Sequence, residues 1–132
     1  MTADMHLTRL TAPLTLTALL SAGAGHAAQP AAPASAVGAT LTGSNGMTLY
    51  TFDKDVAGSG QSACVGQCAS NWPPYLAMQG ETASGDYSIV TRDAGSRQWA
   101  FKGKPLYYWR KDRMPGDKTG DGFNHVWHVA TP

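Results

Sequence analysis

The sequence is poor in the residues that most often do chemistry. Its 132 residues include two cysteines and four histidines, and the formal net charge is +1. There is no Gly-x-Ser-x-Gly nucleophile elbow and no phosphate-binding loop. A nearly neutral chain also gives no general case for nucleic-acid binding. We therefore expect a protein that is not an enzyme and has no nucleic-acid partner.

Long hydrophobic stretches are lacking as well. The apolar run from Leu10 to Leu20 is about half of the roughly 20 residues that a membrane span needs. It follows a polar start ending in Arg9 and precedes a run of small residues, which is the pattern of a secretory signal. We predict a signal peptide over 1–28 and an exported protein, periplasmic or secreted, with no transmembrane segment in the mature chain. No cysteine stands near the cleavage region, so a lipid-anchored form is not supported.

The two cysteines, Cys64 and Cys68, both lie in the mature chain. In an exported protein this pair predicts a disulfide, which would stabilise a small core by about 2 kcal/mol. The alternative is a thiolate pair for copper binding or redox exchange. The spacing favours the disulfide, because no Cys-x-x-Cys pattern is present.

One stretch of the chain occurs twice. Residues 46–55 and 103–112 share Gly, two residues, Leu, Tyr, any residue, an aromatic, two residues and Asp, at a constant offset of 57 positions. A tryptophan follows each copy, Trp72 after the first and Trp127 after the second. Two copies of one strand-and-turn unit therefore organise the chain.

Outside the signal, no segment of eleven or more residues has apolar positions at helical spacing, whereas short alternating runs are common. We predict a mainly β single domain over 37–132, preceded by a flexible Ala- and Pro-rich leader at 29–36. Two similar hairpin or meander repeats, at about 37–75 and 87–131, should pack around a pseudo-twofold axis, because neither has enough apolar surface to stand alone. The expected strands are 39–42, 48–52, 87–92, 97–101, 106–109 and 125–129, with a short helical turn carrying the cysteines.

The residues Tyr50, Phe52 and Asp55, and again Tyr107, Trp109 and Asp112, fit the pattern Tyr-x-(Phe/Trp/Tyr)-x-x-Asp. The chain thus resembles the bacterial family of secreted repeats and predicted lipoproteins with that motif, over nearly the whole mature chain. The resemblance implies an exported, repeat-built envelope protein. It implies no activity, because the family is one of unknown function.

The motif residues have structural and functional interpretations. Asp55 and Asp112 are expected to cap turns through backbone N–H groups, with ligand or metal binding as the alternative. The motif aromatics should be core, but Tyr108 lies on the opposite face of its strand and is a candidate for an exposed contact. Bases gather around it, so the candidate partner-binding residues are Tyr108, Lys104, Arg110 and Lys111.

A second candidate site lies near the C-terminus. Asp117, Thr119 and Asp121, followed by Gly122, look like the start of a calcium loop, although His128 stands where such a loop needs a carboxylate. His125 and His128 are the other candidate ligands, for copper or zinc. No cofactor is expected; a calcium, copper or zinc ion is the open alternative to a turn held by side-chain hydrogen bonds.

These observations lead to two hypotheses of function. The first is a non-catalytic envelope module that binds an envelope protein, a polymer or a small molecule through the aromatic and basic face of the second copy. The alternative is a metal- or redox-handling protein that uses Cys64 and Cys68 or the loop from Asp117 to His128.

Overall fold

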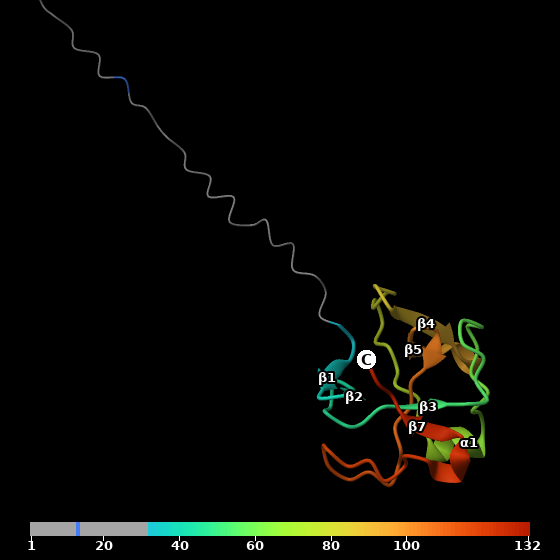
Figure 1. Cartoon of the computed structure of the whole chain (residues 1–132). Coiled ribbons are helices and arrows are strands. Elements are labelled where there is room, and N and C mark those ends of the chain that lie inside the picture. The colour runs from blue at the N-terminus through green and yellow to red at the C-terminus, as the bar shows by residue number, and fades with distance from the viewer. Residues whose placement is uncertain (1–12, 14–31) are drawn as a thin grey trace, which may run out of the picture. The chain divides into compact units, whose positions relative to one another are not determined.

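Short strands and tight turns make up residues 32–132, as their alternating runs and many glycines predict (Figure 1). The computed structural model describes residue 13 and residues 32–132. The predicted signal peptide, apart from residue 13, and the start of the predicted leader lie outside the described residues. The strands are β1 (Ser35–Val37), β2 (Thr40–Thr42), β3 (Tyr50–Phe52), β4 (Tyr87–Thr91), β5 (Arg97–Phe101), β6 (Lys104–Pro105) and β7 (Trp127–Val129). The helices are α1 (Gln67–Asn71) and the short 3-10 turns η1 (Asp93–Gly95) and η2 (Phe123–His125).

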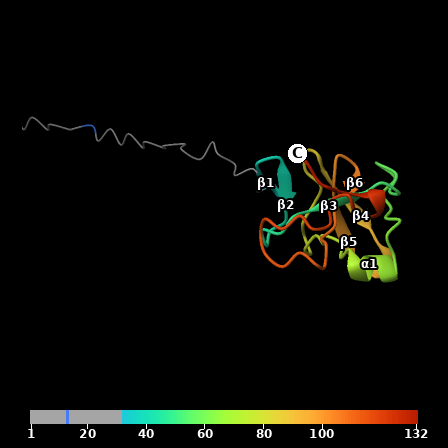
Figure 2. The same cartoon turned by 60° about the horizontal axis from the view of Figure 1, so that its bottom comes forward.

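The strands form three small antiparallel sheets (Figure 2). β1 pairs with β2, β4–β5–β6 is a three-stranded meander whose first two strands were predicted, and β3 pairs with β7. Figures 1 and 2 place the C-terminus beside β1 and β2, where the Leu41 amide donates to the Ala130 carbonyl at 2.8 Å. The prediction of a mainly β fold is confirmed.

The leader is shorter than predicted. Ser35 and Ala36 belong to β1, paired with Thr42 and Leu41, and Ala34 is buried. A flexible leader over 29–36 is therefore wrong for these residues. The Ala- and Pro-rich composition did not indicate a strand here, because β1 depends on its backbone pairing with β2.

Two predicted strands differ from the structure. The strand predicted over 125–129 begins only at Trp127, because Asn124 and His125 have φ of 51° and 59°, outside the extended region. The strand predicted over 106–109 is not formed: β6 covers only Lys104–Pro105, and Tyr107 then makes isolated bridges with Tyr50 and Pro74. Partners from distant parts of the chain determine these bounds.

The two halves match in the backbone hydrogen bonds around their motif leucines. Leu49 and Leu106 hold equivalent places, 57 residues apart, and each makes the same pair of backbone hydrogen bonds. The matched pairs are Leu49 N to Leu41 O (2.9 Å) with Leu106 N to Trp99 O (2.9 Å), and Ala130 N to Leu49 O (2.8 Å) with Tyr75 N to Leu106 O (2.9 Å). Tyr50 and Tyr107 exchange both backbone bonds with each other, at 2.8 and 3.0 Å. The predicted pseudo-twofold axis therefore passes between these two tyrosines.

Alternation along β3 divides the core into two clusters. Leu49 lies in one cluster, with Leu106 and Trp99, whereas Tyr50 lies in the other, with Tyr107 and the tryptophans. Neighbouring residues of a strand point to opposite faces, so one strand serves both clusters. Both copies of the motif thus help to build both cores.

Candidate functional site

Four aromatic rings form a continuous stack in the second core cluster. Phe52 stacks on Trp127 at 4.2 Å, Trp127 on Trp72 at 3.9 Å, and Trp72 on Trp109 at 4.1 Å between ring centroids. Tyr50 meets Trp72 edge-on at 5.2 Å, and Tyr107 meets Trp127 edge-on at 5.1 Å. The stack is therefore itself pseudo-symmetric. Phe52 and Trp109 each stack on the tryptophan of the other repeat, whereas each tyrosine meets the tryptophan of its own repeat.

Gly120 makes the stack possible at one edge. A Cβ atom on this residue would lie 2.6 Å from Cη2 of Trp72 and 2.9 Å from Cγ of Trp109. Only a glycine lets the backbone come this close to the two rings. The loop between the motif and Trp127 is thus fitted to the aromatic core.

The tyrosine and aspartate of the motif join the two repeats. The Tyr50 hydroxyl donates to Oδ2 of Asp112 at 2.6 Å, and the Tyr107 hydroxyl donates to Oδ2 of Asp55 at 2.6 Å. Burial, followed by the carboxylate bond, raises the pKa of both tyrosines. Burial also raises the pKa of Asp55, although the Tyr107 bond opposes it. The signal for this exchange was the equal spacing of Tyr and Asp in the copies, but the sequence does not show which tyrosine meets which acid.

Each aspartate also holds the loop that follows it. Oδ1 of Asp55 accepts the Ala63 amide at 2.6 Å, and Oδ1 of Asp112 accepts the amide and hydroxyl of Thr119 at 3.0 and 2.6 Å. The bonds match the capping interpretation of these acids. Both oxygens of each carboxylate therefore accept a hydrogen bond within the fold.

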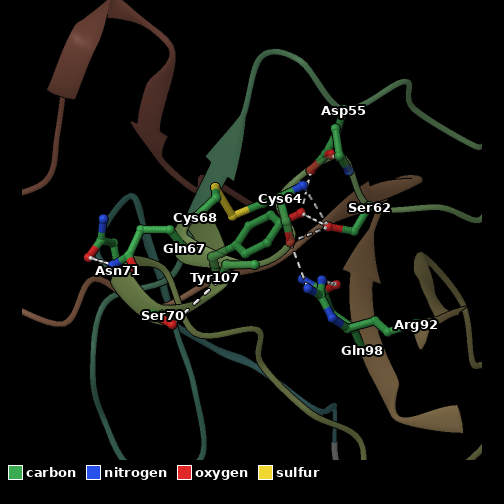
Figure 3. Close-up of a disulfide and its surroundings, with 12 residues drawn as sticks. Asp55, Ser62, Cys64, Gln67, Cys68, Ser70, Asn71, Arg92, Gln98 and Tyr107 are labelled. Carbon is green, nitrogen blue, oxygen red and sulfur yellow. Dashed lines mark hydrogen bonds between the residues drawn. A yellow bond between two sulfur atoms is a disulfide. The ribbon is translucent and has the colours of Figure 1, made fainter. Parts of the chain in front are cut away.

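The cysteines are joined by a disulfide, with a Cα–Cα distance of 5.2 Å. Cys64 is buried, and the guanidinium of Arg92 donates to its carbonyl at 2.6 Å (Figure 3). In the same view the Tyr107 ring lies beside the disulfide, and its hydroxyl meets Ser62 and Asp55. The predicted disulfide is present and closes a short loop next to Ser62 and Ala63, which contact Tyr107 and Asp55.

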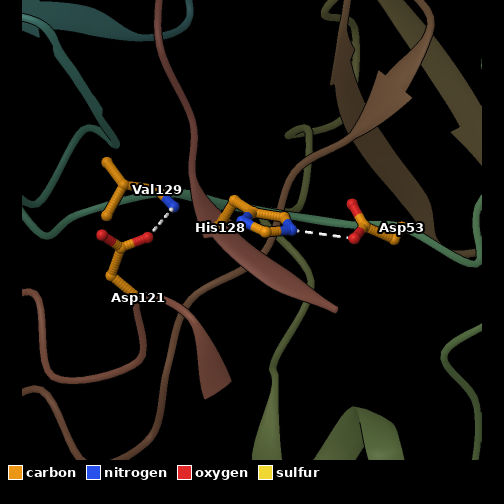
Figure 4. A network of polar contacts seen from close by, with 4 residues as sticks. All are labelled: Asp53, Asp121, His128 and Val129. Carbon is orange, nitrogen blue, oxygen red and sulfur yellow. Dashed lines mark hydrogen bonds and ion pairs between the residues drawn. The ribbon is translucent and has the colours of Figure 1, made fainter. Parts of the chain in front are cut away.

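The residues considered as metal ligands are dispersed among local contacts. Asp117 accepts the amides of Arg113 and Met114, and Asp121 accepts the amide of Val129. His128 points away from Asp121 toward Asp53, with Nε2 2.8 Å from Oδ2 (Figure 4). Thr119 is bound to Asp112, and His125 is exposed. Within residues 32–132, no three His, Cys, Asp or Glu side chains lie close enough to share an ion.

The candidate partner-binding residues do not share one site, although Tyr108 and Arg110 both line a small cavity of about 180 Å³. Tyr108 is not the exposed contact that we predicted: it is half-buried, packs against Tyr75 at 5.5 Å, and has its hydroxyl against Gly43. Burial raises the pKa of Tyr108. Lys104 lines a separate cavity with Lys102 and His128. Alternation gave the correct face for Tyr108 but could not show that the first repeat covers it.

Arg110 and Lys111 lie in the same cavity, together with residues that we did not predict. They line an open cavity of about 580 Å³ whose lining is Trp109, Arg110, Lys111, Arg113, Thr119 and Phe123. Nζ of Lys111 lies 5.9 Å from the centre of the Trp109 ring. Phe123 was not among the predicted residues, because its place in the cavity comes from the turn at η2.

The sequence model of a family described as a secreted repeat of unknown function matches the chain twice, at residues 34–75 and 88–131. The chain belongs to this family and is an exported protein built from two repeats. The matched ranges agree with the structural duplication, and we use them below as the first and second repeat. No curated protein and no solved structure matches the chain. No helix in the described part of the chain is long and apolar enough to cross a membrane.

Proposed function

We propose that this protein is a non-catalytic binding module of the cell envelope, periplasmic or secreted, that takes an anionic partner in the cavity of the second repeat. The observation that carries the proposal is the group of three bases, Arg110, Lys111 and Arg113, around an aromatic floor. Basic side chains at a hollow surface concentrate their field on whatever enters it.

The three bases make no ion pair within the described part of the fold. Among residues 32–132 the one ion pair joins His128 and Asp53, away from this cavity. The nearby carboxylates of Asp112 and Asp117 accept hydrogen bonds from Tyr50, Thr119 and backbone amides. The cavity therefore offers unpaired positive charge to a ligand.

Comparison of the two repeats distinguishes the residues that the fold needs from the residues that are available for binding. The offset of 57 residues matches Arg110 with Asp53, Lys111 with Lys54, and Arg113 with Val56. The tyrosine, aromatic and aspartate of the motif do the same structural work in both repeats. Two of the three bases have no basic counterpart in the first repeat, so folding of the unit does not require them.

The lining of the cavity supports binding rather than catalysis. It contains no His, Cys, Asp or Glu side chain. Arginine and lysine titrate far above neutral pH, so the cavity has no ordinary general acid or base near pH 7. The joined cysteines and the dispersed candidate ligands likewise favour this proposal over metal or redox handling.

The experiment uses polygalacturonate as an anionic polymer probe and measures binding by titration calorimetry. The variant Arg110→Gln/Arg113→Gln should weaken binding about fivefold, and added salt should weaken the wild type. The matched control, Lys102→Gln/Lys104→Gln, removes the same charge at another cavity and should bind like the wild type. Equal losses in both variants would mean that only net charge matters and would refute the site.

A further inference from the structure

The basic cavity borders a second one that residues of both repeats line. A second cavity, of about 330 Å³, is lined by residues that include Phe52, Lys54, Asn71 and Asn124. Phe123 lines both cavities. The residue is 39% exposed, and its ring contacts Trp109 at 4.9 Å and Trp72 at 5.8 Å between centroids. Phe123 is thus a shared wall where the two hollows meet over the aromatic stack.

The pseudo-twofold relation places a lysine in each hollow. Lys54 and Lys111 are equivalent by the offset of 57 residues, and each follows the motif aromatic by two positions. Lys111 lies over Trp109, and Lys54 lines the hollow beside Phe52. The neighbouring acid on the Lys54 side, Asp53, is engaged by His128. An elongated ligand that crosses Phe123 would therefore meet a lysine on each side.

We propose that the two cavities form one extended site for an acidic glycan, a chain of sugar rings that carry carboxylates. This inference rests on the proposed function and names the class of its ligand. Sugar rings would lie on the exposed Phe123 ring, and their carboxylates would pair with Lys54 on one side and with Arg110, Lys111 and Arg113 on the other. The amide side chains of Asn71 and Asn124 supply donors and acceptors for sugar hydroxyls. A small anion would contact only the second-repeat cavity and would not contact Lys54, Asn71 or Asn124.

The test compares oligogalacturonates of two lengths, the disaccharide and a long oligomer, by titration calorimetry. The wild type should bind the long oligomer at least about tenfold more tightly, because contacts in the second hollow become intramolecular. Lys54→Gln should lower affinity for the long oligomer about three- to fivefold and leave the disaccharide unchanged. Lys104→Gln, which removes the same charge elsewhere, should change neither.

The variants separate the two proposals. If Arg110→Gln/Arg113→Gln weakens both probes but Lys54→Gln weakens neither, the extended site is wrong while the basic cavity stands. If Arg110→Gln/Arg113→Gln has no effect on either probe, the proposed function fails and the inference fails with it. The methyl-esterified oligomer keeps the rings without their charges and should not bind. Lys54-dependent binding to phosphatidylglycerol vesicles, without binding to either oligomer, would overturn the glycan in favour of a lipid surface.

Discussion

At the scale of residues, the tyrosine–aspartate exchange links the two repeats. Tyr50 and Tyr107 are fully buried, and each hydroxyl donates to a carboxylate more than fifty positions away. A hydrogen bond to a charged group contributes about 1.5–3 kcal/mol, and a buried acceptor that loses its donor is costly. The two contacts are therefore expected to be important for holding the repeats together.

We expect Tyr107→Phe to lower the free energy of unfolding by about 2 kcal/mol, because Asp55 loses one of its donors. A double-mutant cycle in urea identifies the partner. Tyr107→Phe and Asp55→Ala should couple by about 1 kcal/mol, whereas Tyr107→Phe and Asp112→Ala should be additive within about 0.5 kcal/mol. Equal coupling in both cycles would contradict the exchange between repeats.

The same tyrosines predict sensitivity to alkali. Burial raises the pKa of Tyr50, Tyr107 and Tyr108 above the ordinary value of 10.0. The unfolded chain therefore releases these protons first as pH rises, and the stability that they provide is present below pH 10 and lost above it. The loss is at most about 1.4 kcal/mol per pH unit for each tyrosine. The free energy of unfolding in urea, measured from pH 8 to 11 with phenolate absorbance recorded in parallel, should fall as pH rises. Tyr50→Phe should reduce this slope; an unchanged slope would contradict the argument.

At the scale of elements, the strands were the most predictable part of the fold. The strand at 97–101 has the predicted bounds, and the meander with 87–91 is present, because alternation and turn residues are local signals. The short β1 was missed, since Ser35–Val37 has no alternation that distinguishes it from the leader. Local pattern also could not place Phe123, whose position depends on a turn with two left-handed residues beyond Gly122.

The loop that carries α1 is tied by the Cys64–Cys68 disulfide. Replacement of both cysteines by alanine should lower the free energy of unfolding by about 2 kcal/mol, since the closed loop is short. Thiol titration of the unfolded wild type should give no free thiol before reduction and two afterwards. The variant should keep a similar urea m-value, because the surface exposed on unfolding is nearly the same. Wild-type stability in the double variant would refute a supporting role for the disulfide.

A substitution at Gly120 tests how much the packing of the aromatic stack contributes to stability. Gly120→Ala should destabilise the protein by about 1–3 kcal/mol, because the new methyl group meets Trp72 and Trp109 and the rings must shift. Near-ultraviolet circular dichroism should report the altered packing of the tryptophans. An unchanged spectrum and unfolding midpoint would show that the loop can move away at little cost.

At the scale of the whole molecule, the last paired segment of each repeat joins the other repeat. β7 of the second repeat pairs with β3 of the first, and Pro74 and Tyr75 of the first repeat pair with Tyr107 and Leu106 of the second. The offset between copies predicted two equivalent halves and an axis between them. It could not distinguish pairing within a repeat from pairing across repeats, because both keep the same spacing. That choice depends on contacts far apart in sequence.

The exchange predicts that the repeats remain together when the chain between them is cut. Residues 82–86 form an exposed connection, so a specific protease site inserted between Thr82 and Ala83 should be cleaved in the folded protein. The nicked halves should then co-elute in gel filtration with native circular dichroism, because the hydrogen bonds of β3–β7, the tyrosine–aspartate pairs and the aromatic stack all cross between them. After separation in urea, neither half alone should regain the native spectrum, and mixing should restore it. A first half that refolds as a monomer would show that its β3 does not need β7, and the arrangement across repeats would not be what stabilises the fold.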